Sequence, residues 1–259
     1  MQKIITPTDN EFISSLEKGL RVLKTFSQNR RKMTISEVAE YSNMSKAASR
    51  RYLLTFNALG YINVEGRYFS LTAKILTFSA MYLNSDSLAD VATPYLNDLT
   101  SMVHESSSIS QLQGDDIIYI ARVPTKKIMS INLQVGARLP AWITSMGRVQ
   151  MAYLDQKQQN EMVDRVTFES KTAKTIKTSI ALKEELKKVK SQGYALVDQE
   201  IEEGVISIAV PIFNRNNKVI AGLNIAGSPS VYNKKKLVKE ILPALNNTAE
   251  LIRSSNLSS

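Results

Sequence analysis

Apolar residues recur at helical spacing in three segments of the first sixty residues. Residues 15–26 form the first segment, a short second one begins at Thr34, and a longer third one runs from Ser45 to Gly60. Thr34 followed by Glu37 is a capping-box pattern, while Ser45 and Gly60 are residue types that begin and end helices. A turn of about three residues separates the second segment from the third. The pattern therefore predicts a helix-turn-helix.

A hairpin is predicted directly after the third helix. Residues 61–64 and 67–71 read as short strands, and Glu65 and Gly66 form the tight tip between them. A hairpin in this place is typical of a wing, which contacts the DNA backbone or the minor groove. The alternative is a small helical domain whose hairpin binds protein.

The third helix sorts its residues onto two faces. One face is mainly apolar and is expected to pack inward. The other face is small and basic near the helix start, where a recognition helix meets base edges and phosphates. The inward set is Ser49, Tyr52, Leu53, Phe56 and Leu59, and the outward set is Lys46, Ala47, Ala48, Arg50 and Arg51.

Charge supports a nucleic-acid partner for this part of the chain. The net charge is +9, and basic residues exceed acidic ones by six within residues 1–83. A basic surface of this kind favours a polyanion, although a merely soluble basic surface has the same composition. Arg67 beside the wing tip and the turn of Arg30, Arg31 and Lys32 are expected to contact phosphates.

Residues 72–83 are helical in pattern and apolar on more than one face. We expect this helix to link two domains and to pack against its copy in a dimer; packing on its own domain is the alternative. The polar run at 84–87 breaks the pattern. The predicted organisation is a DNA-binding domain at 1–71, a linker helix at 72–84 and a second domain at 85–259.

The second domain mixes helices with hairpin strands, which predicts an α+β fold with a mainly antiparallel sheet covered by helices. Pro94 either starts or kinks a helix within residues 88–104. The other predicted helices are 146–154, 158–166, 180–192 and 233–253; the predicted strands are 107–113, 117–123, 127–133, 195–199, 206–213 and 219–226.

Catalytic chemistry has little support in the sequence. There is no cysteine, and the single histidine, His104, sits near a predicted helix end, where a structural or surface role is expected. The acidic run at 198–204 lacks metal-ligand spacing and reads as a solvated loop. We expect no enzyme activity, no cofactor, no metal, no membrane span and no secretory signal, in keeping with a cytoplasmic protein.

The ordered set of motifs resembles the IclR family of bacterial transcription regulators over nearly the whole chain. The segments "LEKGLRVLKTF", "ISEVAEYSNMSKAASRRYLLTFNALGYI" and "GRYFSLTAKIL" are similar to that family's first helix, helix-turn-helix and wing. "GDDIIYIARV", "GYALVDQEIEEGVISIAVPIF" and "VIAGLNIAG" follow in family order. "PAWITSMGRV" and "IARVPTKKIMSINL" further resemble the PcaR-, PcaU- and PobR-like branch, which regulates breakdown of aromatic acids through the β-ketoadipate route.

The resemblance implies a GAF-like effector-binding domain with a cup for a small organic acid. It places Ser145, Met146, Val197 or Asp198, Ser207, Asn224 and Ala226 in the cup. Ser207 stands where a cysteine is common in the family, Val197 where an acid often lies, and Asn224 and Ala226 where a pair of serines is usual, which implies a less polar cup as a whole. The N–H groups of Ser145, Met146 and Gly147 at a helix start are a natural seat for a carboxylate. Arg122 and Arg148 are candidate counter-charges, and Trp142 is a candidate cup wall or interface residue.

These observations predict a ligand-responsive regulator of a catabolic operon, with an aromatic or other organic acid as effector. Its expected partners are double-stranded promoter DNA, the effector, and a second copy in a homodimer or a dimer of dimers. Activation, with contact to RNA polymerase, is favoured over repression. Two alternatives stay open: a hydrolase or isomerase of small organic acids with a DNA-binding head, and a DNA-binding structural protein whose cup holds nothing.

Overall fold

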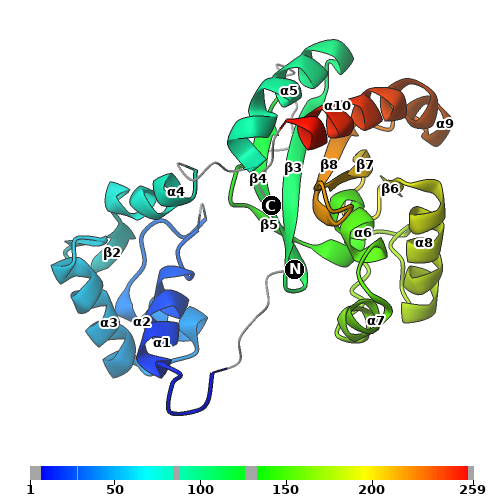
Figure 1. Cartoon of the computed structure of the whole chain (residues 1–259). Coiled ribbons are helices and arrows are strands. Elements are labelled where there is room, and N and C mark those ends of the chain that lie inside the picture. The colour runs from blue at the N-terminus through cyan, green and yellow to red at the C-terminus, as the bar shows by residue number, and fades with distance from the viewer. Residues whose placement is uncertain (1–6, 28, 84–87, 126–132, 256–259) are drawn as a thin grey trace. The chain divides into compact units, whose positions relative to one another are not determined.

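The structure is a computed structural model that describes residues 7–27, 29–83, 88–125 and 133–255. The chain divides into two compact units, residues 2–85 and residues 86–259 (Figure 1). Within the described ranges, no helix is long and apolar enough to cross a membrane.

The first unit is a helix-turn-helix followed by a two-stranded antiparallel hairpin, as predicted. A 3-10 turn and a last helix follow the hairpin, where the sequence predicted one continuous helix. The elements are α1 (Ser14–Leu23), α2 (Ile35–Ser42), α3 (Lys46–Ala58), β1 (Ile62–Glu65), β2 (Tyr68–Leu71), the 3-10 turn (Ala73–Ile75) and α4 (Leu76–Leu83).

Local signals set the ends of the helices in this unit. The Thr34 side chain accepts from the backbone N–H of Glu37, and the Glu37 carboxylate accepts from the backbone N–H of Thr34 at 2.7 Å, so the predicted capping box is confirmed. The hydroxyl of Ser45 caps α3, also as predicted. Gly60 adopts a left-handed φ of 80° just past α3. These contacts satisfy backbone groups that helix ends leave unpaired.

The core of the first unit joins α1, α2 and α3 to the hairpin. Val22, Val38, Leu53 and Phe69 are among its buried residues. The prediction that Leu59 packs inward is wrong: its side chain is 52% exposed. Helix α3 ends at Ala58, so Leu59 no longer follows the helical stripe.

The second unit contains a six-stranded antiparallel sheet in the order β5-β4-β3-β8-β7-β6. This confirms the predicted α+β class. The short edge strand β5 was not predicted, and most of the strand predicted at 127–133 lies outside the described residues. The strands are β3 (Ser106–Gln113), β4 (Asp116–Val123), β5 (Arg138–Pro140), β6 (Ala195–Asp198), β7 (Ile206–Phe213) and β8 (Val219–Gly227).

Five helical regions cover this sheet. Pro94 lies inside a single helix, α5, and the last predicted helix contains a π-helical turn. Gly193, with φ of 81°, ends α8 as predicted. The helices are α5 (Leu88–Val103), α6 (Ser145–Ala152), α7 (Gln156–Asp164), α8 (Ser179–Gln192), and a continuous run of α9 (Lys234–Lys236), the π turn (Leu237–Ile241) and α10 (Leu242–Ser254).

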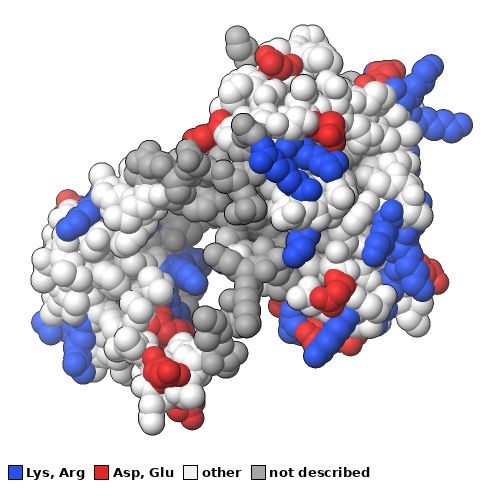
Figure 2. All heavy atoms as spheres, in the orientation of Figure 1, with Lys and Arg blue, Asp and Glu red and all other residues white. Residues whose placement is uncertain are grey.

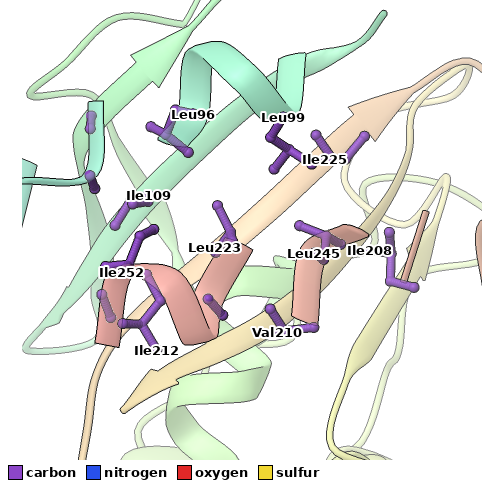
Figure 3. Close-up of a cluster of buried hydrophobic side chains, with 14 of the residues drawn as sticks. Leu96, Leu99, Ile109, Ile208, Val210, Ile212, Leu223, Ile225, Leu245 and Ile252 are labelled. Atoms are coloured by element: carbon purple, nitrogen blue, oxygen red, sulfur yellow. The ribbon is translucent and has the colours of Figure 1, made fainter. Parts of the chain in front are cut away.

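The two faces of the sheet have different partners because side chains alternate along each strand. On β7 and β8, Ile208, Val210, Leu223 and Ile225 point toward α5 and α10 and form one buried cluster (Figure 3). The alternate residues, such as Ala209, belong to a second cluster with α6 and α8. The polar residues Ser207 and Asn224 also lie at alternate positions, so the sheet presents them to the α6 side.

Candidate functional site

The first turns of α3 present a small, basic surface. Lys46, Ala47, Arg50 and Arg51 are exposed, and Ala48 is half-buried. Ser49 and Leu53, on the opposite side of the helix, are fully buried. In Figure 2, Lys and Arg side chains project from the region where Figure 1 draws α3. Exposed cations on a helix held by its other face have the arrangement of a recognition helix.

The basic turn and the wing are held by contacts within the unit. Arg30 donates to the carbonyl oxygen of Thr25 at 3.0 Å, and its guanidinium lies 4.3 Å from the ring centre of Tyr41. Lys32 forms an exposed ion pair with Glu65 at the wing tip. The contacts of Arg30 and Lys32 therefore stabilise the turn, while Arg31 is exposed.

Arg67 lies beside the wing tip, as expected from the sequence. Its guanidinium donates to the hydroxyl of Tyr68 at 3.0 Å and lies over the Tyr68 ring. This hydrogen bond raises the pKa of Arg67 above its ordinary value. The guanidinium therefore keeps its positive charge, which suits a contact with phosphate.

A cavity of about 110 Å³ lies in the second unit between the sheet and the start of α6. Its lining combines an apolar ring with a few polar groups, which is the usual character of a small-molecule site. Strands β4, β7 and β8, the segment 143–146 and the loop at 199–205 all contribute. The lining residues are Tyr119, Arg122, Leu133, Leu139, Ile143, Thr144, Ser145, Met146, Val197, Ile201, Glu202, Val205, Ser207, Asn224 and Ala226.

Strand register places a cation and an amide in one row across the sheet. Arg122 on β4 is opposite Ser108 on β3, and Ser108 is opposite Asn224 on β8. Arg122 donates to the hydroxyl of Ser108 at 2.9 Å. Two strand spacings amount to about 9.5 Å between the backbones of Arg122 and Asn224. A small molecule between the two side chains therefore meets a positive charge at one end and an amide at the other.

The side-chain amide of Asn224 is buried, and its oxygen can accept a further hydrogen bond. The residue is 5% exposed, and its Oδ1 has no hydrogen-bond partner within the described part of the chain. A buried acceptor without a donor costs roughly 1–3 kcal/mol. Since this atom belongs to a residue that lines the cavity, a ligand donor would remove that cost.

Two serines approach each other at another wall of the cavity. Ser207 on β7 donates to the hydroxyl of Ser145, the first residue of α6, at 3.0 Å.

Thr144 caps α6 by accepting from the N–H of Gly147 at 3.1 Å. The predicted carboxylate seat is corrected in this respect: the N–H of Gly147 is already bonded to Thr144. Ser145 and Met146 remain in the cavity lining.

Burial changes the acidity of two lining groups. It raises the pKa of Tyr119 to about 12, because a low-dielectric site disfavours the phenolate. Tyr119 therefore keeps its proton at neutral pH and is available as a donor. Burial also lowers the pKa of Arg122, and a ligand anion would oppose that effect by favouring the charged guanidinium.

Six of the ten residues predicted for the effector site lie in the cavity lining: Ser145, Met146, Arg122, Ser207, Asn224 and Ala226. The structure corrects the other four. Arg148 is fully buried and its guanidinium is bonded to Glu200, at 2.8 and 2.6 Å. Asp198 points to Lys174 in an ion pair, whereas Val197, the alternative at this place, lines the cavity.

Trp142 and Gly147 are packing residues. Trp142 is 6% exposed and meets Phe168 edge-to-face at 5.2 Å between ring centres, so it is neither a cavity wall nor an exposed interface residue. Gly147 lies against the backbone of Ala141. The site residues that the sequence did not single out include Tyr119, Ile143 and Val205. The alternation of side chains along β4 could have identified Tyr119 as an inward-facing residue. No local sequence pattern identified Ile143 or Val205.

The acidic run at 198–204 does not assemble a metal site: none of the described residues form a group of three His, Cys, Asp or Glu side chains suited to a metal. His104 is exposed and ends α5 with a left-handed φ of 56°.

A winged helix-turn-helix with an exposed basic helix, together with a separate α+β unit that encloses a ligand-sized cavity, defines the class of ligand-responsive DNA-binding regulators. Comparison with protein families agrees. The model of the IclR helix-turn-helix domain matches residues 15–66, and that of the bacterial transcriptional regulator IclR C-terminal domain matches residues 80–254. The chain belongs to the IclR family of bacterial transcriptional regulators.

Individual relatives within this family give a more specific comparison than the family models do. The chain is 38% identical to the Pca regulon regulatory protein of Pseudomonas putida, over 92% of this chain and 82% of that protein. It is 34% identical to the p-hydroxybenzoate hydroxylase transcriptional activator of Acinetobacter baylyi, over 94% and 92%. Among solved structures, it matches the inducer binding domain of an Acinetobacter PobR double mutant in complex with 3-hydroxybenzoic acid. That match has 32% identity and a TM-score of 0.61, and covers 64% of this chain and 98% of that one.

Proposed function

We propose that this protein senses a single-ring aromatic acid and controls transcription of genes for its breakdown. The observation that carries the proposal is the cavity itself, with Arg122 at one end of a cross-strand row and the unsatisfied amide of Asn224 toward the other. In this proposal the ligand's carboxylate pairs with Arg122, and a ring hydroxyl donates to Asn224.

Size favours one ring. The cavity measures about 110 Å³, less than the engineered apolar cavity of about 150 Å³ that holds a single benzene ring, so it has no room for a second ring. The apolar lining residues Ile143, Met146 and Val205 suit the faces of a flat ring. The relatives support the same class of ligand, since one is named for p-hydroxybenzoate hydroxylase and another holds 3-hydroxybenzoic acid.

Calorimetric titration of the full chain tests this proposal. The panel is 4-hydroxybenzoate, 3-hydroxybenzoate, benzoate and cyclohexanecarboxylate. We expect a hydroxybenzoate to bind tightest. A hydrogen bond to a charged group contributes about 1.5–3 kcal/mol, so Arg122→Met should weaken binding roughly 10- to 100-fold.

A matched variant tests the amide. Asn224→Leu keeps the branched outline of the side chain and removes the acceptor, so the preference for hydroxybenzoates over benzoate should disappear while benzoate affinity is retained. Absence of binding by all four compounds, or unchanged affinity in Arg122→Met, would contradict the proposed effector class.

For DNA, we infer that α3 enters the major groove with Lys46, Ala47, Ala48, Arg50 and Arg51, and that Arg31 and Arg67 contact phosphates. Arg50→Ala and Arg51→Ala should abolish specific promoter binding in a gel shift while the protein stays folded. Arg67→Ala should weaken binding to all sequences alike and reduce the salt dependence by about one phosphate contact. Specific binding that survives both α3 substitutions would refute the recognition-helix assignment.

Self-association is part of the proposal. On α4, Leu76 is 63% and Met81 is 70% exposed, while Phe78 stacks on Tyr61 of its own unit at 5.4 Å and is still 52% exposed. Apolar groups left exposed in this way are typical of an interface. We therefore assign residues 72–84 to a linker helix between a DNA-binding domain (1–71) and an effector-binding and oligomerisation domain (85–259). Leu76→Asp should shift the sedimentation of the protein toward the monomer.

Two finer points belong to this proposal. The name of the Acinetobacter baylyi relative favours activation over repression. Activation would involve contact with RNA polymerase at the promoter. The protein itself is proposed to act in the cytoplasm. The chain is proposed to bind its ligand without turning it over, since its relatives are named as regulators. Chromatography of each benzoate after prolonged incubation with the protein checks this, and formation of any product would revive the enzyme alternative.

A further inference from the structure

An ion pair between Arg148 and Glu200 joins two walls of the cavity without lining it. Arg148 belongs to α6, whose first two residues, Ser145 and Met146, line the cavity on one side. Glu200 is the second residue of the loop at 199–205, whose Ile201, Glu202 and Val205 line the cavity on the other side. The two side chains are 1% and 12% exposed. They are thus a buried bridge between elements that are far apart in sequence.

The geometry of the pair is unusually well defined. The Arg148 guanidinium donates to both Glu200 carboxylate oxygens, at 2.8 and 2.6 Å, and its Nε donates to the carbonyl oxygen of Trp142 at 2.8 Å. The backbone N–H of Ile176 donates to the same carboxylate at 3.3 Å. A two-point Arg–carboxylate pair sets orientation as well as distance. The bridge therefore aligns the start of α6 and the start of the loop.

Hydrogen bonds from other residues also converge on the start of the loop. The hydroxyl of Thr172 donates to the carbonyl of Gln199, and the hydroxyl of Thr175 donates to that of Glu200, both at 2.6 Å. Gln199 and Gly204 are both in the left-handed region, with φ of 59° and 84°, so the chain reverses at each end of the loop. Residues 202–204 between them are exposed. The described contacts thus hold the loop mainly at its first two residues.

Stability alone does not explain a buried ion pair. Removing an arginine and a glutamate from water is costly, and apolar residues of similar volume often serve stability equally well. What an apolar pair lacks is directional hydrogen bonding. We propose that Arg148 and Glu200 are positioning residues of the effector site, which hold the 199–205 wall at the separation from α6 that a flat ring requires. The inference rests on the proposed effector function but concerns residues that touch no ligand.

The test uses the full chain with Glu200→Gln, which keeps the shape and removes the charge. Because this variant leaves a buried arginine poorly paired, a second variant, Arg148→Met with Glu200→Leu, replaces the pair by apolar groups. Two control variants accompany both of these pair variants. Asp115→Asn neutralises the exposed pair between Asp115 and Arg165, and Leu245→Ala destabilises the core on the opposite face of the sheet.

Two measurements are made. With 4-hydroxybenzoate and 3-hydroxybenzoate as probes, the Kd should rise at least tenfold in both pair variants and less than twofold in both controls, while promoter affinity without ligand stays unchanged. In the ligand-free protein, amides at 199–205 should exchange hydrogen at least tenfold faster in the pair variants only. Wild-type Kd in the double variant, or unchanged exchange in Glu200→Gln, would overturn the proposal.

The two measurements also separate this inference from the proposed function. If the wild-type protein binds neither benzoate, the proposed effector class is refuted. The exchange of residues 199–205 then still decides whether the ion pair positions the loop.

Discussion

Gly147 sits inside a helix, yet replacing it with alanine should destabilise the protein. A helix interior ordinarily favours alanine over glycine by about 1 kcal/mol. At this position, however, an added Cβ would lie 2.1 Å from the carbonyl oxygen of Ala141 and 2.4 Å from its Cα. Both atoms are backbone, so no side-chain rotation relieves the contact. Helix α6 or the 141–143 turn must move.

The magnitudes decide the sign of the effect. Overpacking a core costs typically about 1–3 kcal/mol, and a rigid backbone contact falls at the upper end or beyond it. Subtracting the propensity gain leaves a net loss of about 2 kcal/mol or more. For a unit of this size each kcal/mol corresponds to about 2–4 °C, so the melting temperature of the second unit should fall by roughly 4–8 °C.

Differential scanning calorimetry of the full chain measures this change, with Gly19→Ala as the control. Gly19 is also a helical glycine, but its added Cβ would meet only side-chain rings, those of Phe56 at 3.4 Å and Tyr52 at 3.6 Å. Propensity should therefore dominate there and leave the first unit equally stable or up to about 1 kcal/mol more stable. Equal shifts of the same sign in the two variants, or an unchanged melting temperature in Gly147→Ala, would refute the reasoning.

Two further predictions follow from single contacts. Thr34→Ala removes the hydroxyl that accepts from the N–H of Glu37, while the backbone N–H of residue 34 can still donate to the Glu37 carboxylate, and it should destabilise the first unit by about 1 kcal/mol. Thr34→Ser should melt as the wild type does in the same scan. The pKa of Tyr119 is raised to about 12 from an ordinary 10.0, so the unfolded chain ionises first as pH rises. The associated stability, roughly 3 kcal/mol, is fully present below pH 10 and is lost as the pH approaches 12. In urea titrations, Tyr119→Phe should therefore lose less stability than the wild type over that interval; parallel losses would contradict the assignment.

Local patterns predicted the elements well where the deciding atoms are close in sequence. The capping box at Thr34, the cap at Ser45 and the left-handed glycine at 193 all act within one turn of the residues they control. Strands with alternating residues, such as β3, were also predicted. Leu59 was misplaced because the helical stripe was extended one residue past the end of the helix.

The site was predicted less completely. Resemblance to the IclR family pointed to Ser145, Ser207 and Asn224, and the structure places all three along one cavity. Arg148 was interpreted as a ligand counter-charge because it is a cation at a helix start. Its actual partner, Glu200, lies 52 positions further along the chain, and no local pattern identifies such a pair.

By itself, the sequence determined the order of the elements, the basic recognition helix and the family, because these depend on residue types at short spacing. The tertiary structure decided which polar groups meet each other. Gly147 shows both levels: the bond from its N–H to Thr144 is a local cap that spans three residues, whereas only the fold shows that its missing side chain lets α6 lie against the backbone of Ala141. Packing of one backbone against another depends on contacts across the whole domain, and a local pattern carries no record of them.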